Sequence, residues 1–281
     1  MNLGKWQRWR LRWFPPRCGG AWRLPTERER FHVFLLAGQS NMAGHGCMRD
    51  DDPWQPGDFD PVPGVVVLGG QARPRSSRPG GWVRWRPATH PLHLSQASSA
   101  FGLGLEFART YQLLRPGVTV GLVPCAWGGA AIDLFGDGRP LRRNAVFRGR
   151  LAARHGTLQG VLWHQGESDT MDEAAALCHE DKLRALVGGL RSELGIGDLF
   201  FAIGDLSPAL AAAKERDDPR WAARIARVRA GLRRMAEEDP HAAWVASDGL
   251  PAAGRDVFHF DRAALVEMGR RYAQAVVAHG C

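Results

Sequence analysis

Apolar runs and amphipathic segments alternate along most of the chain. Runs rich in β-branched residues predict strands at 31–38, 64–70, 118–126, 158–166, 199–206 and 242–247. Apolar residues at helical spacing predict helices at 102–114, 172–194, 219–238 and 261–279. Strands that alternate with helices usually form a parallel sheet with helices on both faces. The pattern predicts an α/β fold, a three-layer α/β/α sandwich.

Two local features refine this picture. In the segment 102–114, Leu103, Phe107, Tyr111 and Leu114 lie on one helical stripe, and Asp261 stands at a plausible N-cap of the last helix. The region from about 45 to 100 is instead rich in proline, glycine, arginine and tryptophan. Long irregular insertions of this kind are usually binding loops or disordered segments. No internal repeat or linker divides the chain.

Composition adds one separate segment to this domain. The chain has 281 residues, a formal net charge of +8 and a sequence pI near 9.9. Much of the positive charge lies in residues 1–29, where arginines alternate with tryptophans, so we expect a basic arm followed by a single domain at 30–281. Such an arm can contact nucleic acid or an anionic membrane. A surface arm that packs its tryptophans on the domain is the favoured interpretation, and no nucleic-acid partner is expected.

The sequence shows neither a signal-peptide pattern nor an apolar run of membrane-spanning length. A cytoplasmic protein is therefore expected, although a leader missing from the sequence would change that expectation. The five cysteines include no CxxC pair, which favours free thiols over a zinc site or a disulfide framework.

The first candidate for chemistry is the stretch LLAGQSNMAG at 35–44, which places Ser40 just after a predicted strand. Open parallel sheets bind their ligands at this end of the strands. A serine hydroxyl is a poor nucleophile until a base removes its proton, and a serine here can equally cap a helix. The segment lacks the G-x-S-x-G elbow because Met42 replaces the second glycine.

A base is available near the C-terminus, where GRDVFHFD contains Asp256 and His259. If this loop turns like a helix, residues three apart face the same way and the carboxylate can orient the imidazole. A loop salt bridge is the alternative. Donors for an oxyanion are available at Gly128 and Gly129, after the third predicted strand, and at Gln165, after the fourth.

Four motifs occur in a fixed order: GQSNMAG, GLVPCAWGGAAID, VLWHQGESD and DVFHFD. Together they resemble the conserved blocks of the SGNH hydrolase superfamily, and more closely its carbohydrate esterase family 6 and sialate O-acetylesterase-like branch. The resemblance spans roughly residues 31–279. It implies a flavodoxin-like SGNH hydrolase fold with a central parallel sheet, and a serine esterase that needs no cofactor or metal.

The resemblance also implies roles for individual residues. Ser40 would be the nucleophile, His259 the base and then the acid, and Asp256 the group that orients the base. Glu167, in the HQGE motif, competes with Asp256 for that orienting role, and the sequence leaves the choice open. The oxyanion would be bound by the backbone N–H of Ser40, by a backbone N–H of Gly128 or Gly129, and by the side chain of Gln165.

Substrate contacts are expected from Gln39, Asn41, Trp127 and His164. Trp82, Trp85 and Trp163 are further aromatic candidates for a sugar ring, although tryptophans at strand ends often belong to the core. His164 does not indicate a metal site, because HQGE lacks the second histidine of H-E-x-x-H. Ala130 and Ala131 depart from the related proteins, which usually carry a hydroxyl residue there, and this affects substrate preference.

The leading hypothesis is therefore a serine esterase that removes O-acetyl groups from a carbohydrate, of the acetyl xylan or sialic acid type, through an acetyl-enzyme. The first alternative is a short-chain esterase that acts on non-sugar acyl esters. The second is a carbohydrate-binding protein without turnover. Neither the acetylated substrate nor the oligomeric state can be read from the sequence.

Overall fold

The computed structural model describes residues 23–47, 51–69, 83–93, 100–254 and 256–280. In this part of the chain the main sheet has seven strands in the order β3-β2-β4-β1-β5-β6-β7. Neighbouring strands are parallel except β2 and β3. The strands are β1 (Phe31–Gly38), β2 (Val65–Leu68), β3 (Trp85–Pro87), β4 (Thr119–Pro124), β5 (Thr157–His164), β6 (Phe200–Gly204) and β7 (Ala242–Val245).

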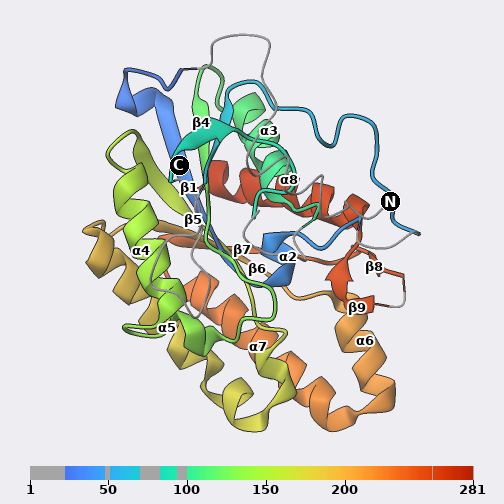
Figure 1. Ribbon diagram of the computed structural model, residues 1–281. Coiled ribbons are helices and arrows are strands. Elements are labelled where there is room, and N and C mark those ends of the chain that lie inside the picture. Colours follow the sequence, from blue (N-terminus) through green and yellow to red (C-terminus); the bar gives the residue numbers. More distant parts are fainter. Residues whose placement is uncertain (1–22, 48–50, 70–82, 94–99, 255, 281) are drawn as a thin grey trace.

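Helices cover both faces of this sheet, which completes the three predicted layers (Figure 1). The α-helices are α2 (Ser40–Ala43), α3 (Gly104–Leu114), α4 (Pro140–Ala152), α5 (Glu173–Leu194), α6 (Pro208–Asp217), α7 (Pro219–Glu238) and α8 (Arg262–Ala278). Short 3₁₀ turns are η1 (Arg28–Arg30), η2 (Ile132–Phe135) and η3 (Asp169–Met171). No helix among the described residues has both the length and the apolar character to cross a membrane.

The two cores follow from the alternation of side chains along each strand. Phe34 and Leu36 of β1 pack with α3 and α8 on one face. Val33 and Leu35 point to the other face, where they join a core that includes residues of α4, α5 and α7. Strands buried on both faces need apolar residues at every position, which is why β1 reads as a continuous hydrophobic run.

All six predicted strands and all four predicted helices are present, with ends that shift by a few residues. Asp261 caps α8, since its Oδ1 accepts a hydrogen bond from the Ala264 backbone N–H at 2.7 Å. On the predicted stripe of α3, Leu103, Phe107 and Tyr111 are buried, whereas Leu114 is exposed. The basic arm at 1–29 lies largely outside the described residues, because their first residue is 23.

Besides the four-residue α2, two helices and three strands were not expected from the sequence. In α4 the buried face includes Arg142 and Arg148, so its apolar stripe is interrupted by charge. The α6 helix has no clear apolar stripe at all, and its alanines give little periodicity. The β3 strand lies within the irregular region 45–100, and β8 (Ala252–Ala253) with β9 (Asp256–Phe260) forms a small separate antiparallel sheet.

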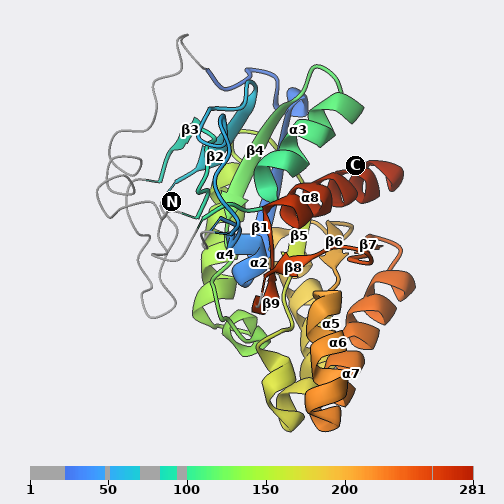
Figure 2. The ribbon, with the colours of Figure 1, turned by 90° about the vertical axis from the view of Figure 1, so that its right-hand side faces the viewer.

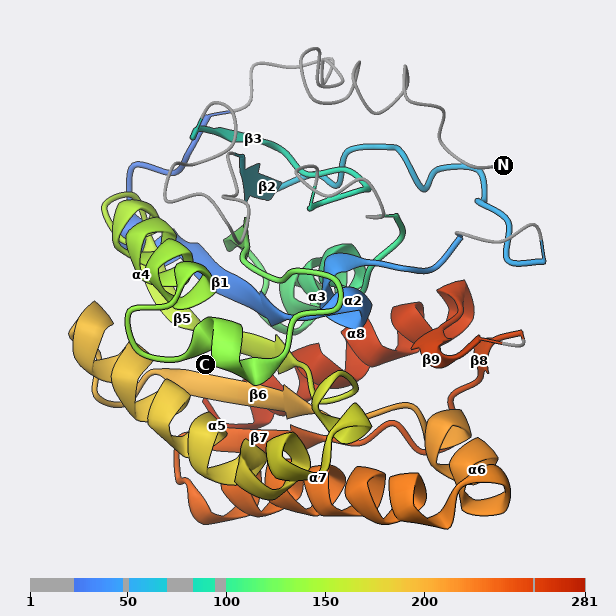
Figure 3. The ribbon, with the colours of Figure 1, turned by 60° about the horizontal axis from the view of Figure 1, so that its bottom comes forward.

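The position of β1 decides where a ligand can bind. It lies between β4 and β5. The strands β2, β3 and β4, which follow β1 in the chain, are on one side of it, and β5, β6 and β7 are on the other, so the direction of strand addition reverses at β1. In open α/β sheets, ligands bind beyond the carboxyl ends of the strands at such a switch point. Figure 3 shows these strand ends pointing toward α2 and the β8–β9 sheet, and Figure 2 shows α2 beside β9.

A glycine allows the chain to turn sharply from β1 into α2. Gly38 has φ +129°, and a Cβ placed there would lie 2.0 Å from the backbone oxygen of His164. The same oxygen accepts a hydrogen bond from the Gln39 backbone N–H at 2.8 Å. Only glycine permits this close crossing of the end of β5, which places Ser40 beside the segment that follows β5.

We expect Gly38→Ala to lower the free energy of unfolding by more than about 3 kcal/mol, because both the φ angle and the backbone contact oppose a side chain. Gly188→Ala is the control. Gly188 is an exposed glycine inside α5 with no atom within 4 Å of the added Cβ, so this change should raise stability by about 0.5–1 kcal/mol. Urea unfolding of both variants measures the difference, and equal stabilities would contradict this account of the turn.

Candidate active site

Ser40, His259 and Asp256 form a continuous chain of hydrogen bonds. Ser40 Oγ lies 2.8 Å from His259 Nε2, and His259 Nδ1 lies 2.6 Å from Asp256 Oδ2. A carboxylate only accepts, so Nδ1 carries the proton and Nε2 is free to accept the serine hydroxyl. The ring therefore has the tautomer that a general base beside a serine requires.

The Asp256–His259 pair forms on an extended strand, not on the helix-like turn expected from its spacing. Both residues belong to β9, where side chains three apart would normally point to opposite faces. Asp256 Oδ1 accepts the backbone N–H of Phe258 at 3.1 Å, and the β8–β9 register shifts at Ala252/Ala253. This local closure of the strand turns the carboxylate toward the imidazole.

A second histidine covers one face of His259. The ring of His45 stacks on that of His259 with centroids 3.9 Å apart and an interplanar angle of 18°. Burial, followed by the charge of His259, lowers the pKa of His45 to about 4, which Asp256 only partly offsets. His45 is thus neutral near pH 7 and can pack against a protonated His259 without adding charge. One feature of the sequence could have pointed to His45: it directly follows GQSNMAG and lies between Gly44 and Gly46.

Glu167 does not contact His259, so it does not compete with Asp256 for the ring. It is 2 % exposed, and its Oε1 accepts a hydrogen bond from Asn41 Nδ2 at 2.6 Å. Burial raises the pKa of Glu167 to about 7, a rise that its hydrogen bonds only partly oppose. His164 Nε2 lies 3.8 Å from Oε1, but burial lowers the pKa of His164 to about 3, so no positive charge compensates there.

Gln165 also differs from its predicted role as an oxyanion donor. Its Nε2 donates to the backbone oxygen of Ala130 at 3.1 Å and to Asp169. Its Oε1 contacts His179 Nε2 at 3.0 Å, and the residue is fully buried. Both amide hydrogens therefore have acceptors within the protein. The Gln165 side chain thus joins the end of β5 to Ala130, Asp169 and His179.

Backbone N–H groups are the remaining candidates for oxyanion donors. Ser40 is the first residue of α2, where an N–H has no acceptor within the helix. Gly128 and Gly129 form a turn after β4, which Ala130 closes by donating to the Trp127 oxygen at 3.1 Å. Gly129 is exposed and has φ +70°, and a Cβ added there would meet no atom within 4 Å, so its backbone is open to a ligand.

Three of the four predicted substrate contacts are inside the protein. Gln39, Asn41 and His164 are at most 3 % exposed. The Gln39 Oε1 accepts the backbone N–H groups of Gly166 and Ser168, both at 3.3 Å, and so joins the β1–α2 turn to the segment after β5. Trp127 is the partly exposed member of the set. The other three side chains are therefore buried and hydrogen-bonded within the protein, instead of lying on its surface.

Most of the aromatic candidates likewise belong to the core. Trp163 is fully buried against Phe135, and Trp85 is 6 % exposed against Phe31. Trp82 lies outside the described residues.

A different aromatic pair adjoins the catalytic strand. Trp221 at the start of α7 lies 5.8 Å from Phe258, measured between ring centroids, and both are partly exposed. Lys214 Nζ sits 4.2 Å from the Trp221 ring. Phe258 lies within the DVFHFD motif, but the sequence does not point to Trp221, because the α6–α7 segment carries none of the four motifs.

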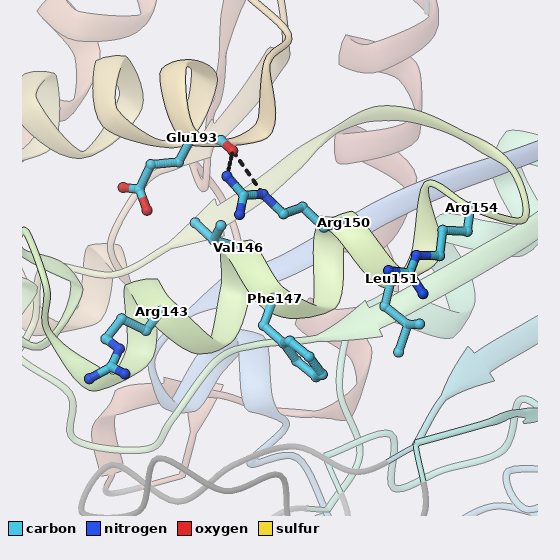
Figure 4. A pocket seen from close by; sticks show the side chains of 7 residues that line it. All are labelled: Arg143, Val146, Phe147, Arg150, Leu151, Arg154 and Glu193. Atoms are coloured by element: carbon cyan, nitrogen blue, oxygen red, sulfur yellow. Dashed lines mark hydrogen bonds between the residues drawn. The ribbon is translucent and has the colours of Figure 1, made fainter.

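A hollow elsewhere in the molecule does not belong to this site. Its volume is about 420 Å³, and it lies along α4 (Figure 4). It is lined by Arg143, Val146, Phe147, Arg150, Leu151, Arg154 and Glu193. None of these residues contacts the Ser40 region. The candidate site is therefore identified by the residue types and hydrogen bonds of Ser40, His259 and Asp256, and not by the volume of a hollow. Within the described ranges no three histidine, cysteine or acidic residues are grouped to hold a metal ion.

Comparison with known proteins assigns the chain to a family. Residues 30–278 match the family model described as carbohydrate esterase, sialic acid-specific acetylesterase. The chain belongs to this family. It is therefore a carbohydrate esterase, that is, a carboxylic ester hydrolase, with the SGNH-type α/β/α fold that the motifs predicted.

Individual relatives agree with this assignment. A probable carbohydrate esterase of Arabidopsis thaliana is 30 % identical over 257 residues, which are 89 % of this chain and 91 % of that protein. An X-ray structure of an Arabidopsis thaliana protein aligns with a TM-score of 0.74 at 27 % identity, over 89 % of this esterase and 99 % of that chain. The crystal structure of NanS shares the fold, with a TM-score of 0.67 at 18 % identity and coverage of 90 % and 98 %.

The burial of Glu167 should make the free energy of unfolding depend on pH. Its pKa rises from an ordinary 4.5 to about 7, so its contribution to the free energy of unfolding is complete below about pH 4.5 and is lost as the pH rises through 7. Glu167→Gln stays neutral at every pH. The variant should therefore gain stability relative to wild type between about pH 5 and pH 8, by roughly 3 kcal/mol at most. Urea unfolding at several pH values measures it, and a difference independent of pH would contradict the shift.

Proposed function

We propose that this carbohydrate esterase is a serine enzyme that removes O-acetyl groups from carbohydrates through an acetyl-enzyme intermediate. The observation that carries the proposal is the hydrogen-bonded chain from Ser40 through His259 to Asp256, at 2.8 Å and 2.6 Å. The three residue types, the tautomer of the imidazole and the order of the partners match the requirements of acyl transfer by a serine.

The reaction would proceed in two halves. Ser40 Oγ attacks the acetyl carbonyl carbon while His259 Nε2 takes the hydroxyl proton, and the negative charge develops on the carbonyl oxygen. His259 then gives the proton to the departing sugar oxygen, which leaves acetyl-Ser40. In the second half His259 removes a proton from water, and the hydroxide attacks the acetyl group. The bond to Ser40 Oγ then breaks, acetate leaves, and His259 returns its proton to Oγ. Asp256 stabilises the imidazolium in both halves.

The oxyanion would be stabilised by backbone N–H groups. The first is the N–H of Ser40 itself, which lies at the start of α2. The second comes from the Gly128–Gly129 turn after β4, where the neighbouring strand ends beside β1. Gln165 has no part in this proposal, because its amide hydrogens are bonded elsewhere.

The family and the aromatic side chains near the strand ends both support a carbohydrate substrate. The family includes sialic acid-specific acetylesterases, and a carbohydrate acetylesterase of Xanthomonas citri has a similar fold. The partly exposed rings of Trp127, Trp221 and Phe258 offer flat apolar surface of the kind that packs on sugar rings. We therefore favour an acetylated carbohydrate over a simple acyl ester.

We expect Ser40→Ala and His259→Ala to lower kcat/KM for p-nitrophenyl acetate by roughly 10³-fold or more, because each removes a member of the proton-transfer chain. Asp256→Asn should lower kcat by about 10²–10⁴-fold, since an amide does not stabilise the imidazolium. Initial rates measure these effects on folded variants. Ser40→Ala with wild-type activity would eliminate the serine mechanism. Binding of glycans without turnover by the wild type would favour a carbohydrate-binding protein.

The acyl group and the alcohol can be tested separately. Acetyl esters should be hydrolysed faster than butyryl esters if the enzyme is a deacetylase, and O-acetylated sugars should have a higher kcat/KM than p-nitrophenyl acetate if the alcohol is recognised. Release of acetate from acetylated xylan and from O-acetyl sialic acid ranks the two sugar types. A preference for longer acyl chains with no response to the sugar would instead indicate a general short-chain esterase.

A further inference from the structure

The side chain of Asn41 joins two parts of the site that are far apart in the sequence. Asn41 follows Ser40 in α2 and is fully buried. Its Nδ2 donates to the backbone oxygen of Phe258 at 3.0 Å, and its Oδ1 accepts the backbone N–H of Phe260 at 3.1 Å. These two backbone groups lie on either side of His259, so one amide holds the strand immediately before and after the base.

The strand needs such support because the central sheet does not supply it. Within the described chain β9 pairs only with the two residues of β8, in a separate sheet. Asp256 bonds to the neighbouring Phe258 N–H and to the His259 ring, which are contacts within β9 itself. The hydrogen bonds of Asn41 instead tie β9 to the helical turn that carries Ser40. They therefore bear directly on the distance between Oγ and Nε2.

Glu167 completes this arrangement from the other side. The second hydrogen of Asn41 Nδ2 is donated to Glu167 Oε1 at 2.6 Å, and Glu167 is itself buried after β5. The Asn41 amide thus bonds to three partners that are fixed in position: two backbone groups of β9 and one carboxyl oxygen. A carboxyl oxygen accepts an N–H whether or not the other oxygen is protonated. The contact can therefore persist across the pH range in which Glu167 titrates.

We propose that Asn41 and Glu167 are positioning residues that hold β9 so that His259 Nε2 lies against Ser40 Oγ, and that neither residue touches the substrate. The two acidic residues near the histidine then have separate tasks. Asp256 acts on the imidazole ring, and Glu167 acts through Asn41 on the backbone that carries the ring. The inference rests on the proposed serine mechanism and adds a role for the two buried side chains.

The test compares Asn41→Ala with Asn144→Ala, a matched change of a buried asparagine in α4 that is 6 % exposed. Displacement of a catalytic group by about 1 Å can cost about 10²-fold in rate. We expect Asn41→Ala to lower kcat for p-nitrophenyl acetate by about 10–100-fold with KM within about twofold of wild type. Asn144→Ala should lower thermal stability and leave kcat within about twofold.

A pair of Glu167 variants tests the other half of the proposal. Glu167→Gln keeps an oxygen that accepts from Asn41 and should hold kcat within about threefold of wild type. Glu167→Leu removes the acceptor and should lower kcat by about tenfold, again with little change in KM. A structural role alone would lower stability without this rescue by glutamine. If Asn41→Ala does not fold, the comparison between these two variants decides.

The proposal is overturned if folded Asn41→Ala keeps kcat within twofold of wild type, or if Glu167→Gln and Glu167→Leu lose activity equally. Ser40→Ala, measured in the same series, separates this failure from failure of the proposed function. If Ser40→Ala is inactive while Asn41→Ala is fully active, the serine mechanism stands and only the positioning role is lost. If Ser40→Ala is active, the serine mechanism itself fails.

Discussion

The hydrogen bond between Ser40 and His259 is the contact on which the rest of the site depends. It joins atoms 219 residues apart in the sequence, and no local structure connects them. The nucleophile reaches this contact because Gly38 lets β1 turn closely across the end of β5. The base reaches it on a short strand outside the central sheet. Two segments that are distant in the sequence must therefore be held together for the proton transfer that the proposed mechanism requires.

Buried polar side chains, not substrate-facing ones, provide this precision. Gln39, Asn41 and Gln165 are all buried, and each uses its amide to fix backbone or side-chain groups near the strand ends. A buried amide is costly unless its hydrogen bonds are made, so these residues favour one arrangement of the loops over slightly displaced ones. Most polar side chains of the motifs GQSN and HQGE therefore support the position of the Ser40 hydroxyl, which is itself only 5 % exposed.

The sequence predicted the secondary structure correctly where hydrophobic periodicity determines it. The strands β1, β4 and β5 are buried on both faces and stood out as apolar runs, and α7 and α8 had clear apolar stripes. It failed for α4, where Arg142 and Arg148 lie on the buried face, and for β9, which was expected to turn like a helix. In both cases tertiary contacts override the local pattern.

For the site, the sequence identified Ser40, His259 and Asp256 as a group, and the structure brings them together. It could not show whether Asp256 or Glu167 orients His259, because the answer depends on the position of Asn41 between Glu167 and β9. It also missed the stacking of His45 on His259, since ring orientation is set by packing and not by spacing. The positions of Glu167 and His45 depend on side-chain direction, which tertiary packing determines and sequence spacing does not.

The proposed mechanism depends on transfer of the acetyl group to Ser40. The most direct measurement is acid quenching of the enzyme within milliseconds of mixing with p-nitrophenyl acetate, followed by peptide mapping with mass spectrometry. We expect an acetyl adduct on the peptide that contains Ser40, formed by the wild type and absent from Ser40→Ala. Turnover with no adduct on that peptide, or with the adduct on another residue, would contradict the mechanism.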